Sequence, residues 1–207
     1  MLQSISVVYF LLFGTSVNVN AFSLISFESI YVRKRIINAQ QPDKKILDIG
    51  CGLGFSTSSS KGSLGIDDNM SVLNIAAKTF PEKRFQHGDV MFWDTDEKFD
   101  IVTSMFYMHE NPSPVRQKVI EMAKKHAKER VIIVDLAPEF EPCDETIAKN
   151  PHMENYLDNC RSEMAEFSER VIMNGKINVW ILDLNTEINN EEELDSLDKV
   201  IRFYRPT

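Results

Sequence analysis

The sequence predicts an α/β protein with one doubly wound, seven-stranded sheet whose last strand runs antiparallel. Five short apolar segments alternate with helical patterns between residues 46 and 135, which is typical of βαβ units. A glycine-rich turn follows the first segment, and the signal for a hairpin, Asn174-Gly175, lies between two β-prone segments near the end. With 207 residues, 43% of them hydrophobic, the chain can form one domain with a full core, and not comfortably two.

The first predicted strand and its turn form the segment around which the chain is organised, residues 44–57, KKILDIGCGLGFST. Apolar residues at 46–49 predict a short buried strand, and Gly50, Gly52 and Gly54 follow it directly. Glycine lets a backbone turn sharply and approach a ligand, because no Cβ stands in the way. Amides of such a turn, opening onto a helix, form a site for polar or anionic groups. We therefore expect a ligand to bind against this turn.

Three residues beside these glycines narrow the kind of ligand. Asp48 lies two residues before the first glycine, where an acid can reach a ligand's amino group. Cys51 is interpreted as a small side chain that fits the turn, and not as a nucleophile. A phosphate-binding dinucleotide loop needs a third glycine where this chain has Phe55. This departure disfavours a nucleotide-binding oxidoreductase.

The connection to the second strand, residues 55–63, has the sequence FSTSSSKGS and is rich in serine. Serine is a poor helix former because its hydroxyl competes for backbone hydrogen bonds, so we expect a short helix at most. The second strand, at 64–67, ends in Asp67 about nineteen residues after the acid of the first strand. That is the expected place of a ribose-binding carboxylate. Asp68 or Asn69 is expected to cap the helix that follows.

The next three strands are predicted at 85–90, 99–106 and 131–135. A Gly-Asp pair leaves Asp89 with two interpretations, a turn at the end of the strand or a ligand contact. The fourth strand is almost continuously apolar, which is typical of a strand buried on both faces. It leads to His109, beyond the carboxyl end of the strand, where ligands bind in open α/β sheets.

The last third of the chain predicts a long helix and the hairpin. Six apolar residues between Met153 and Phe167 fall on one helix face. The segments at 169–173 and 176–184 flank the hairpin signal and supply the last two strands. The tail, residues 185–207, contains an acidic run and is assigned no role.

Residues 1–21 are predicted to be a targeting presequence, followed by an N-terminal helical segment at 22–43. The apolar run at 5–13 is too short to span a bilayer, and a small-residue site ends at Ala21. The junction with Phe22 resembles the bipartite presequences of algae with complex plastids, which implies a plastid location without a stable membrane span. An ordinary secretory signal peptide, or an uncleaved apolar helix on a cytoplasmic protein, is the alternative.

The pattern D-x-G-x-G-x-G at 48–54, with the acid ending the second strand and the Gly-Asp pair of the third, resembles class I S-adenosylmethionine (SAM)-dependent methyltransferases. The resemblance covers 44–184 and is nearest to small-molecule enzymes of the ubiquinone-biosynthesis type. The stretches at 99–112, 131–142 and 153–159 resemble a subgroup of algal members. The resemblance implies a Rossmann-like sheet and methyl transfer from SAM to a small-molecule acceptor.

The resemblance also implies which residues bind the cofactor, on the glycine turn and at the strand ends. They are Asp48, Gly50, Cys51, Gly52, Gly54, Asp67, Asp68, Asp89, Val90 and Ser104. A longer helix usually occupies the place of residues 55–63, so the serine-rich connection departs from the family pattern. The segment before the first strand often covers the cofactor, so Tyr31 or Arg33 could face the pocket, although a packed surface helix is favoured.

The acceptor side of the predicted site contains His109 and Asp135. Since a sulfonium is already activated, the protein chiefly aligns a nucleophile with the methyl group. His109 is a candidate general base for a hydroxyl acceptor, because histidine titrates near neutral pH, or it orders its loop by hydrogen bonding. Asp135 orients the acceptor or caps a turn.

Composition and missing motifs argue against other functions. The net charge of −8 and the pI near 5.1 argue against nucleic acid as a partner. Three widely spaced cysteines without a CxxC motif indicate neither a disulfide framework nor a zinc site, and no metal is expected. Motifs of DNA adenine, arginine and magnesium-dependent catechol methyltransferases are not found. A catalytically silent SAM-binding protein stays open, because binding motifs do not prove transfer. The oligomeric state is not predicted.

Overall fold

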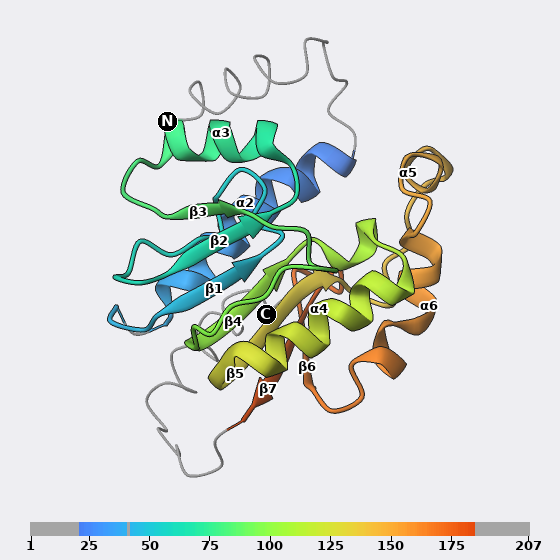
Figure 1. Ribbon diagram of the computed structural model, residues 1–207. Helices are drawn as coiled ribbons and strands as arrows, with labels where there is room; N and C mark the ends of the chain where they lie inside the picture. The colour runs from blue at the N-terminus through green and yellow to red at the C-terminus, as the bar shows by residue number, and fades with distance from the viewer. Residues whose placement is uncertain (1–20, 41, 185–207) are drawn as a thin grey trace.

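A computed structural model describes residues 21–40 and 42–184, which form one seven-stranded sheet in the order β3-β2-β1-β4-β5-β7-β6 (Figure 1). The strands are β1 (Ile46–Ile49), β2 (Leu64–Asp67), β3 (Phe85–His87), β4 (Phe99–Met105), β5 (Ala127–Leu136), β6 (Ser168–Ile172) and β7 (Ile177–Asp183). Strands β1 to β5 pair in parallel, β7 pairs antiparallel with β5, and β6 pairs antiparallel with β7. The predicted doubly wound sheet with an antiparallel last strand is confirmed.

Helices cover both faces of this sheet. They are α2 (Ala21–Asn38), α3 (Met70–Thr79), α4 (Ser113–His126), α5 (Asp144–Lys149) and α6 (Met153–Glu163), with the 3-10 turn η1 (Met108–Glu110). In Figure 1, α4 lies in front of the sheet and α2 lies behind it. None of the described helices combines the length and apolar character that crossing a membrane requires.

Successive residues of the central strands enter two different cores. Leu47 and Ile133 belong to the core that also contains residues of α4 and α6. Ile46 and Ile132 belong to the core on the other face, where Val32 and Ile36 of α2 pack. Burial on both faces explains the nearly continuous apolar sequence of these strands. Because β1 pairs in parallel with β2 and with β4, the carboxyl ends of these three strands lie at one edge of the sheet.

Strand β5 begins before the predicted residue 131, α5 was not predicted, and two further elements end earlier than predicted. The long helix expected between Met153 and Phe167 ends at Glu163, although Met164 and Phe167 remain buried in the turn beyond it. Strand β3 ends at His87, because the Asp89 carboxylate accepts a hydrogen bond from the backbone N–H of Met91 at 2.8 Å and starts a turn. The turn at Asp89 is therefore observed, and its contact with a ligand stays a prediction.

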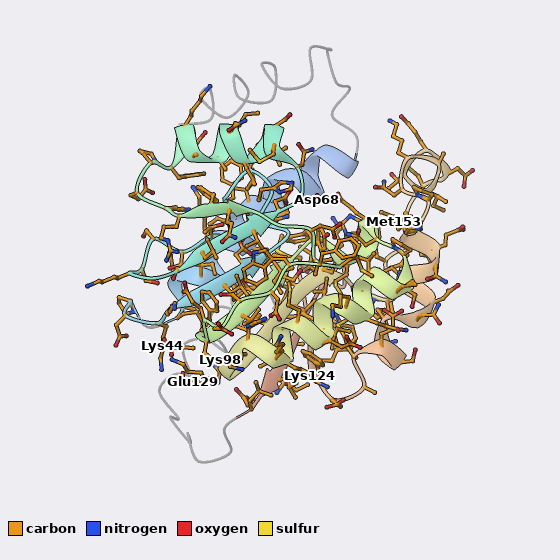
Figure 2. All side chains as sticks on the ribbon, in the orientation of Figure 1. Lys44, Asp68, Lys98, Lys124, Glu129 and Met153 are labelled. Atoms are coloured by element: carbon orange, nitrogen blue, oxygen red, sulfur yellow. The ribbon has the colours of Figure 1, made fainter. Side chains whose placement is uncertain are left out.

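The two edges of the sheet carry different chemistry. Figure 2 shows Asp68 at the edge toward which the parallel strand arrows point, and Lys44 and Glu129 at the opposite edge. Lys44 Nζ lies 2.6 Å from Glu129 Oε2, an ion pair that joins the chain before β1 to β5. The predicted presequence up to residue 20 and the acidic tail at 185–207 lie outside the described residues. The plastid location stays a prediction.

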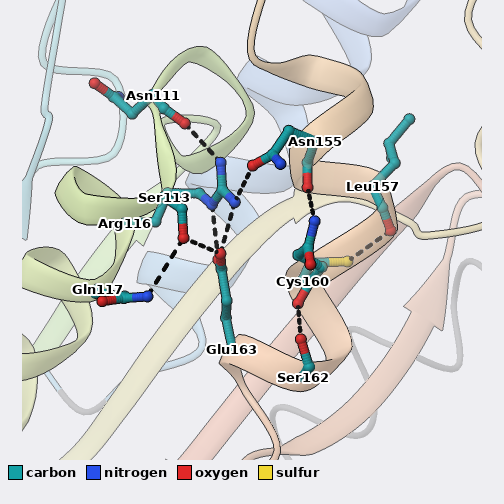
Figure 3. A network of polar contacts seen from close by, with 10 residues as sticks. Asn111, Ser113, Arg116, Gln117, Asn155, Leu157, Cys160, Ser162 and Glu163 are labelled. Atoms are coloured by element: carbon teal, nitrogen blue, oxygen red, sulfur yellow. Dashed lines mark hydrogen bonds and ion pairs between the residues drawn. The ribbon is translucent and has the colours of Figure 1, made fainter.

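A buried polar network joins α4 to α6 on the front face (Figure 3). The Arg116 side chain has no exposed surface, and its Nε and Nη2 donate to Glu163 at 2.7 and 2.6 Å. Nη2 also donates to Asn155 Oδ1, and Nη1 donates to the carbonyl of Asn111, each at 2.8 Å. Because Asn111 directly follows η1, one guanidinium ties the end of that turn to α6.

Candidate functional site

The glycine turn after β1 has left-handed backbone at all three glycines, with φ of +68° at Gly50, +50° at Gly52 and +78° at Gly54. A Cβ on Gly50 would lie 2.4 Å from the ring of Tyr107, and one on Gly54 would lie 2.6 Å from the ring of Phe85. A Cβ on Gly52 would meet nothing within 4 Å. Two glycines are therefore required by internal packing, whereas Gly52 presents bare backbone to open space.

This difference predicts that alanine costs more stability at Gly50 than at Gly52. Gly52→Ala should lower the free energy of unfolding by about 1–3 kcal/mol, the cost of left-handed backbone in a residue with a side chain. Gly50→Ala should cost about 1–3 kcal/mol more, because the ring of Tyr107 must move. Urea unfolding measures both values. In a Tyr107→Ala background the two costs should become similar; a persisting gap would show that the ring is not responsible.

Asp67 reaches from the end of β2 to the glycine turn. Its Oδ2 accepts a hydrogen bond from the backbone N–H of Gly52 at 2.8 Å, and its Oδ1 accepts one from Asn69 at 3.0 Å. Asp68, the next residue, is exposed. Of the two predicted helix caps, Asn69 is the one observed, because its Oδ1 accepts from the N–H groups of Ser71 and Val72. Asp68 is thereby left without the capping role.

Asp48 lies beneath the turn and has no exposed surface. Its carboxylate accepts hydrogen bonds from the hydroxyls of Ser56 and Thr57, each at 2.8 Å, and from Thr103 at 3.2 Å. Burial raises the pKa of Asp48, and these hydroxyls oppose the rise. In this structure Asp48 holds the serine-rich connection against β4, and its contact with a ligand's amino group stays a prediction.

The other predicted cofactor residues occupy three environments. Cys51 is buried against Gly65, and burial raises the pKa of its thiol, which agrees with a packing role. Asp89 is half-buried and Val90 is buried in the turn after β3. The Ser104 hydroxyl, near the carboxyl end of β4, is buried with no hydrogen-bond partner among the described residues.

His109 and Asp135, separated by 26 residues, are joined directly in the structure. The imidazole Nδ1 lies 2.6 Å from Asp135 Oδ1. The other carboxylate oxygen accepts from the backbone N–H groups of Met108 at 2.8 Å and His109 at 3.3 Å. Asp135 has no exposed surface, so it both orients the imidazole and caps η1. The turn-capping role considered for it is observed, and its orienting role toward an acceptor stays a prediction.

The pKa of His109 reflects two opposing effects. Burial disfavours the imidazolium, but the charge of Asp135 and its hydrogen bond outweigh burial and raise the pKa above its ordinary value. With Nδ1 bonded to Asp135, Nε2 is the free ring nitrogen for proton transfer, and it lies 3.9 Å from Glu110 Oε1. The pair has the geometry of a general base held by a buried carboxylate.

Tyr107, which the sequence did not assign, and Arg33, which it considered as facing the pocket, also belong to this region. Tyr107 packs on Gly50, and burial together with the charges of Asp68 and Asp67 raises the pKa of its phenol. Arg33 of α2 donates from Nη1 to Ser56 Oγ at 3.2 Å and stacks over Phe106, with its Cζ 4.9 Å from the ring centroid. The position of Tyr107 directly after β4 is a signal that could have identified it.

The backbone between β4 and η1 is strained. Phe106 has φ of +56° although it is not glycine, a conformation that costs about 1–3 kcal/mol and tends to occur at functional sites. The backbone N–H of Phe106 donates to Val134 at 2.7 Å. This bend directs the chain into Tyr107 and η1, and so places His109 above the carboxyl end of β5.

Arg33 enters the site from α2, and Tyr31 does not. The charges of Asp48, Asp135 and Glu110 act on the Arg33 guanidinium, while burial is the larger effect and lowers its pKa. Tyr31 is 45% exposed. The segment is a packed helix, as favoured, since Val32 and Ile36 pack in the core on one face of the sheet, and Arg33 reaches Ser56 and Phe106 from it.

The carboxyl edge of the sheet fits a cofactor that contains a nucleoside. Gly52 leaves open space against bare backbone, and the Asp67 carboxylate lies beside it. A carboxylate at the end of the second strand can accept hydrogen bonds from both hydroxyls of a ribose. Among the described residues, no group of three or more metal-ligating side chains is found. The arrangement suits proton transfer at His109 beside a bound nucleoside.

Comparison with known proteins agrees with this geometry. Residues 46–130 match the model of a methyltransferase domain family. A putative methyltransferase, 235L of Invertebrate iridescent virus 6, is 32% identical over 115 residues, which cover 50% of this chain and 43% of the viral protein. The chain thus spans less than half the length of that relative.

Solved structures show the same fold. Magnesium protoporphyrin IX methyltransferase of Synechocystis PCC 6803 has a TM-score of 0.58 at 16% identity, covering 88% of this chain and 100% of that one. The N-methyltransferase NodS of Bradyrhizobium japonicum has a TM-score of 0.58 at 14% identity, covering 82% and 90%. A TehB-like methyltransferase of Corynebacterium glutamicum has a TM-score of 0.51 at 20% identity, covering 72% and 85%. The expected class I methyltransferase fold is confirmed.

Proposed function

We propose that this chain, which carries a class I SAM-dependent methyltransferase domain, transfers a methyl group from SAM to a hydroxyl of a small-molecule acceptor. The single observation that carries the choice of acceptor is the His109–Asp135 pair at the same sheet edge as the glycine turn. A hydroxyl is a poor nucleophile until its proton is removed, and a paired imidazole beside the cofactor site can accept that proton.

The residues of the glycine turn and β2 would hold SAM. Asp67 accepts the ribose hydroxyls, the bare backbone at Gly52 allows close approach, and Tyr107 covers the turn. SAM supplies a methyl group already activated by its sulfonium. The roles of Asp89, Val90 and Ser104 toward the cofactor stay predictions.

The chain's own residues then manage the proton. Nε2 of His109 takes the hydroxyl proton as the acceptor oxygen forms its bond to the methyl carbon, and the bond from that carbon to sulfur breaks. Asp135 keeps the imidazole in the tautomer with Nε2 free and stabilises the imidazolium. The products are the methyl ether, S-adenosylhomocysteine and a proton on His109, which is later released to solvent.

Arg33 is a further candidate for the cofactor side. Its guanidinium stacks over Phe106 and donates to Ser56. The charges of Asp48 and Asp135 act on it. A guanidinium held in this way binds a carboxylate in a bidentate manner. We infer that Arg33 receives a carboxylate of SAM or of the acceptor.

Incubation of the full chain with SAM labelled in its methyl group and a metabolite extract tests the proposed activity. A labelled hydroxyl-bearing product together with S-adenosylhomocysteine is the expected result. Binding of SAM without any labelled product would identify a catalytically silent SAM-binding protein instead. Stabilisation by NADH and not by SAM in a thermal-shift assay would favour the oxidoreductase alternative.

Asp67→Ala tests the cofactor site directly. Loss of charge-assisted hydrogen bonds, worth roughly 1.5–3 kcal/mol, should weaken SAM binding at least tenfold while the fold remains intact. Isothermal titration calorimetry measures the affinity. The exposed Asp96 offers a matched control, since Asp96→Ala removes an acid of the same size outside the site. Equal affinity in wild type and Asp67→Ala would contradict the ribose assignment.

A further inference from the structure

A second concavity lies away from the carboxyl edge, between α2 and the serine-rich connection. It has a volume of about 520 Å³ and is lined from α2, from residues 55–60 and from the turn after α3. Residues 55–63 contain no helix, as their serine content predicted. An extended connection covers less of the sheet than a helix would, so a groove remains beside Ile46 at the start of β1.

Two lysines from different elements meet in this groove. Lys34 projects from α2 and Lys83 from the turn after α3, and both line it. Burial lowers the pKa of Lys83, and Lys34 is close enough to lower it further, although Glu82 and Asp48 oppose the shift. Lys83 donates to the carbonyl of Gly54 at 2.9 Å, which uses one of the three donors of an ammonium. Two lysines lining one groove favour an anionic ligand there.

The serine-rich connection adds hydroxyl donors to the same wall. Ser58, Ser59 and Ser60 all line the groove. Ser60 Oγ donates to the carbonyl of Lys44 and lies 2.9 Å from Ser58 Oγ, which accepts from the Ser60 N–H at 3.1 Å, so these two hydroxyls are held in place by protein partners. The Ser59 hydroxyl can turn its hydrogen toward a bound oxygen. The connection is therefore suited to bind an anionic head group.

The rest of the groove is mostly apolar, with Asn38, Gln40 and Thr57 as its other polar members. Ile37, Pro42, Ile46 and Phe55 form its apolar lining. Gln40, which is 5% exposed, also lines it, and its Oε1 has no hydrogen-bond partner among the described residues. An acceptor oxygen left in this way needs a donor, and a ligand hydroxyl or amide can supply one. The lining therefore fits a ligand with an anionic head and an apolar body.

We propose that this groove is a binding site for a small phosphorylated molecule with an apolar or aromatic body, separate from the cofactor site. Its volume is within the range of small-molecule sites, and none of the ten residues assigned to the cofactor lines it. The head group lies between Lys34, Lys83 and the serine hydroxyls, and the body packs on Phe55 and Ile46. The site does not depend on the proposed methyl transfer, because it uses other residues.

Phenyl phosphate is a suitable probe, followed by NMR of the backbone amides of the full chain. Saturable shifts are expected at residues 55–60 and around Lys83, with little change at Gly52 and Asp67. Inorganic phosphate should shift the same residues more weakly, and benzyl alcohol weaker still. Shifts that do not saturate, or that centre on the glycine turn, would overturn the proposal.

Charge variants separate a built site from general attraction. Lys34→Met should weaken phenyl phosphate at least tenfold, about 1.4 kcal/mol, while leaving SAM affinity and the melting temperature near wild type. Lys61→Met is the matched control, because Lys61 is exposed on the same connection and does not line the groove. Equal losses in the two variants would reduce the effect to screened surface charge and overturn the site.

Discussion

His109→Gln is expected to lower kcat by roughly 10²–10⁴-fold on a hydroxyl acceptor, the usual contribution of a general base, with SAM affinity nearly unchanged. Glutamine is close to histidine in size and can still bond Asp135 but accepts no proton. Since Asp135 also holds the backbone of Met108 and His109, η1 should keep its position in this variant. Steady-state rates and calorimetry of SAM binding separate the two effects.

The pH dependence of the wild-type rate carries the same information. The pKa of His109 is raised above 6.5. As the pH drops through this raised pKa, the imidazole is protonated, the neutral base is lost and the rate should fall. The effect of the His109–Asp135 pair on the stability of the fold has the opposite pH dependence. The protonated pair stabilises the fold below the ordinary pKa, and this stabilisation is lost as the pH rises through the raised one.

Asp135→Asn tests the origin of that shift. Burial is the largest effect on His109 and lowers its pKa, so removal of the Asp135 charge should move the acid limb of the rate profile to lower pH. A histidine outside the site, His152, provides the control, and His152→Gln should leave the profile unchanged.

If His109→Gln retains full kcat at pH 7, His109 has no chemical role, and an acceptor such as a thiolate, which needs no base, would explain transfer.

Arg116→Ala should lower the free energy of unfolding by about 3–5 kcal/mol, because it leaves the buried Glu163 carboxylate without its partner. Arg116→Lys should recover little, since an ammonium cannot reproduce the fork that reaches Glu163, Asn155 and the Asn111 carbonyl together. Urea unfolding at constant pH measures both. The network in Figure 3 also predicts a loss of kcat, because Asn111 ends the turn that carries His109.

Two comparisons make the Arg116 prediction specific. The double variant Arg116→Met/Glu163→Leu should be more stable than Arg116→Ala, because it removes both charges together. Lys124→Met, which breaks an exposed pair with Glu166, should cost only about 0–1 kcal/mol. Similar losses for Arg116→Ala and Lys124→Met would show that the buried network adds no more than a surface ion pair.

Local patterns in the sequence determined the sheet and one side of the site. Alternation of apolar strands and helices predicted the parallel strands, because burial on both faces requires apolar residues. Three glycines spaced by two predicted the turn, and the acid ending the second strand predicted Asp67, because the carboxyl ends of parallel strands meet at one edge. The serine content of residues 55–63 predicted a short helix at most, and the structure has none there.

Tertiary packing alone decided the other side of the site. The sequence placed His109 and Asp135 at neighbouring strand ends, but their 2.6 Å contact depends on the bend at Phe106 and on the Arg116 network. Asp48 lies buried beneath the turn, where its carboxylate accepts hydrogen bonds from the Ser56 and Thr57 hydroxyls of the connection. Such contacts join segments distant in the chain. Their partners and distances follow from how whole elements pack, which no local pattern encodes.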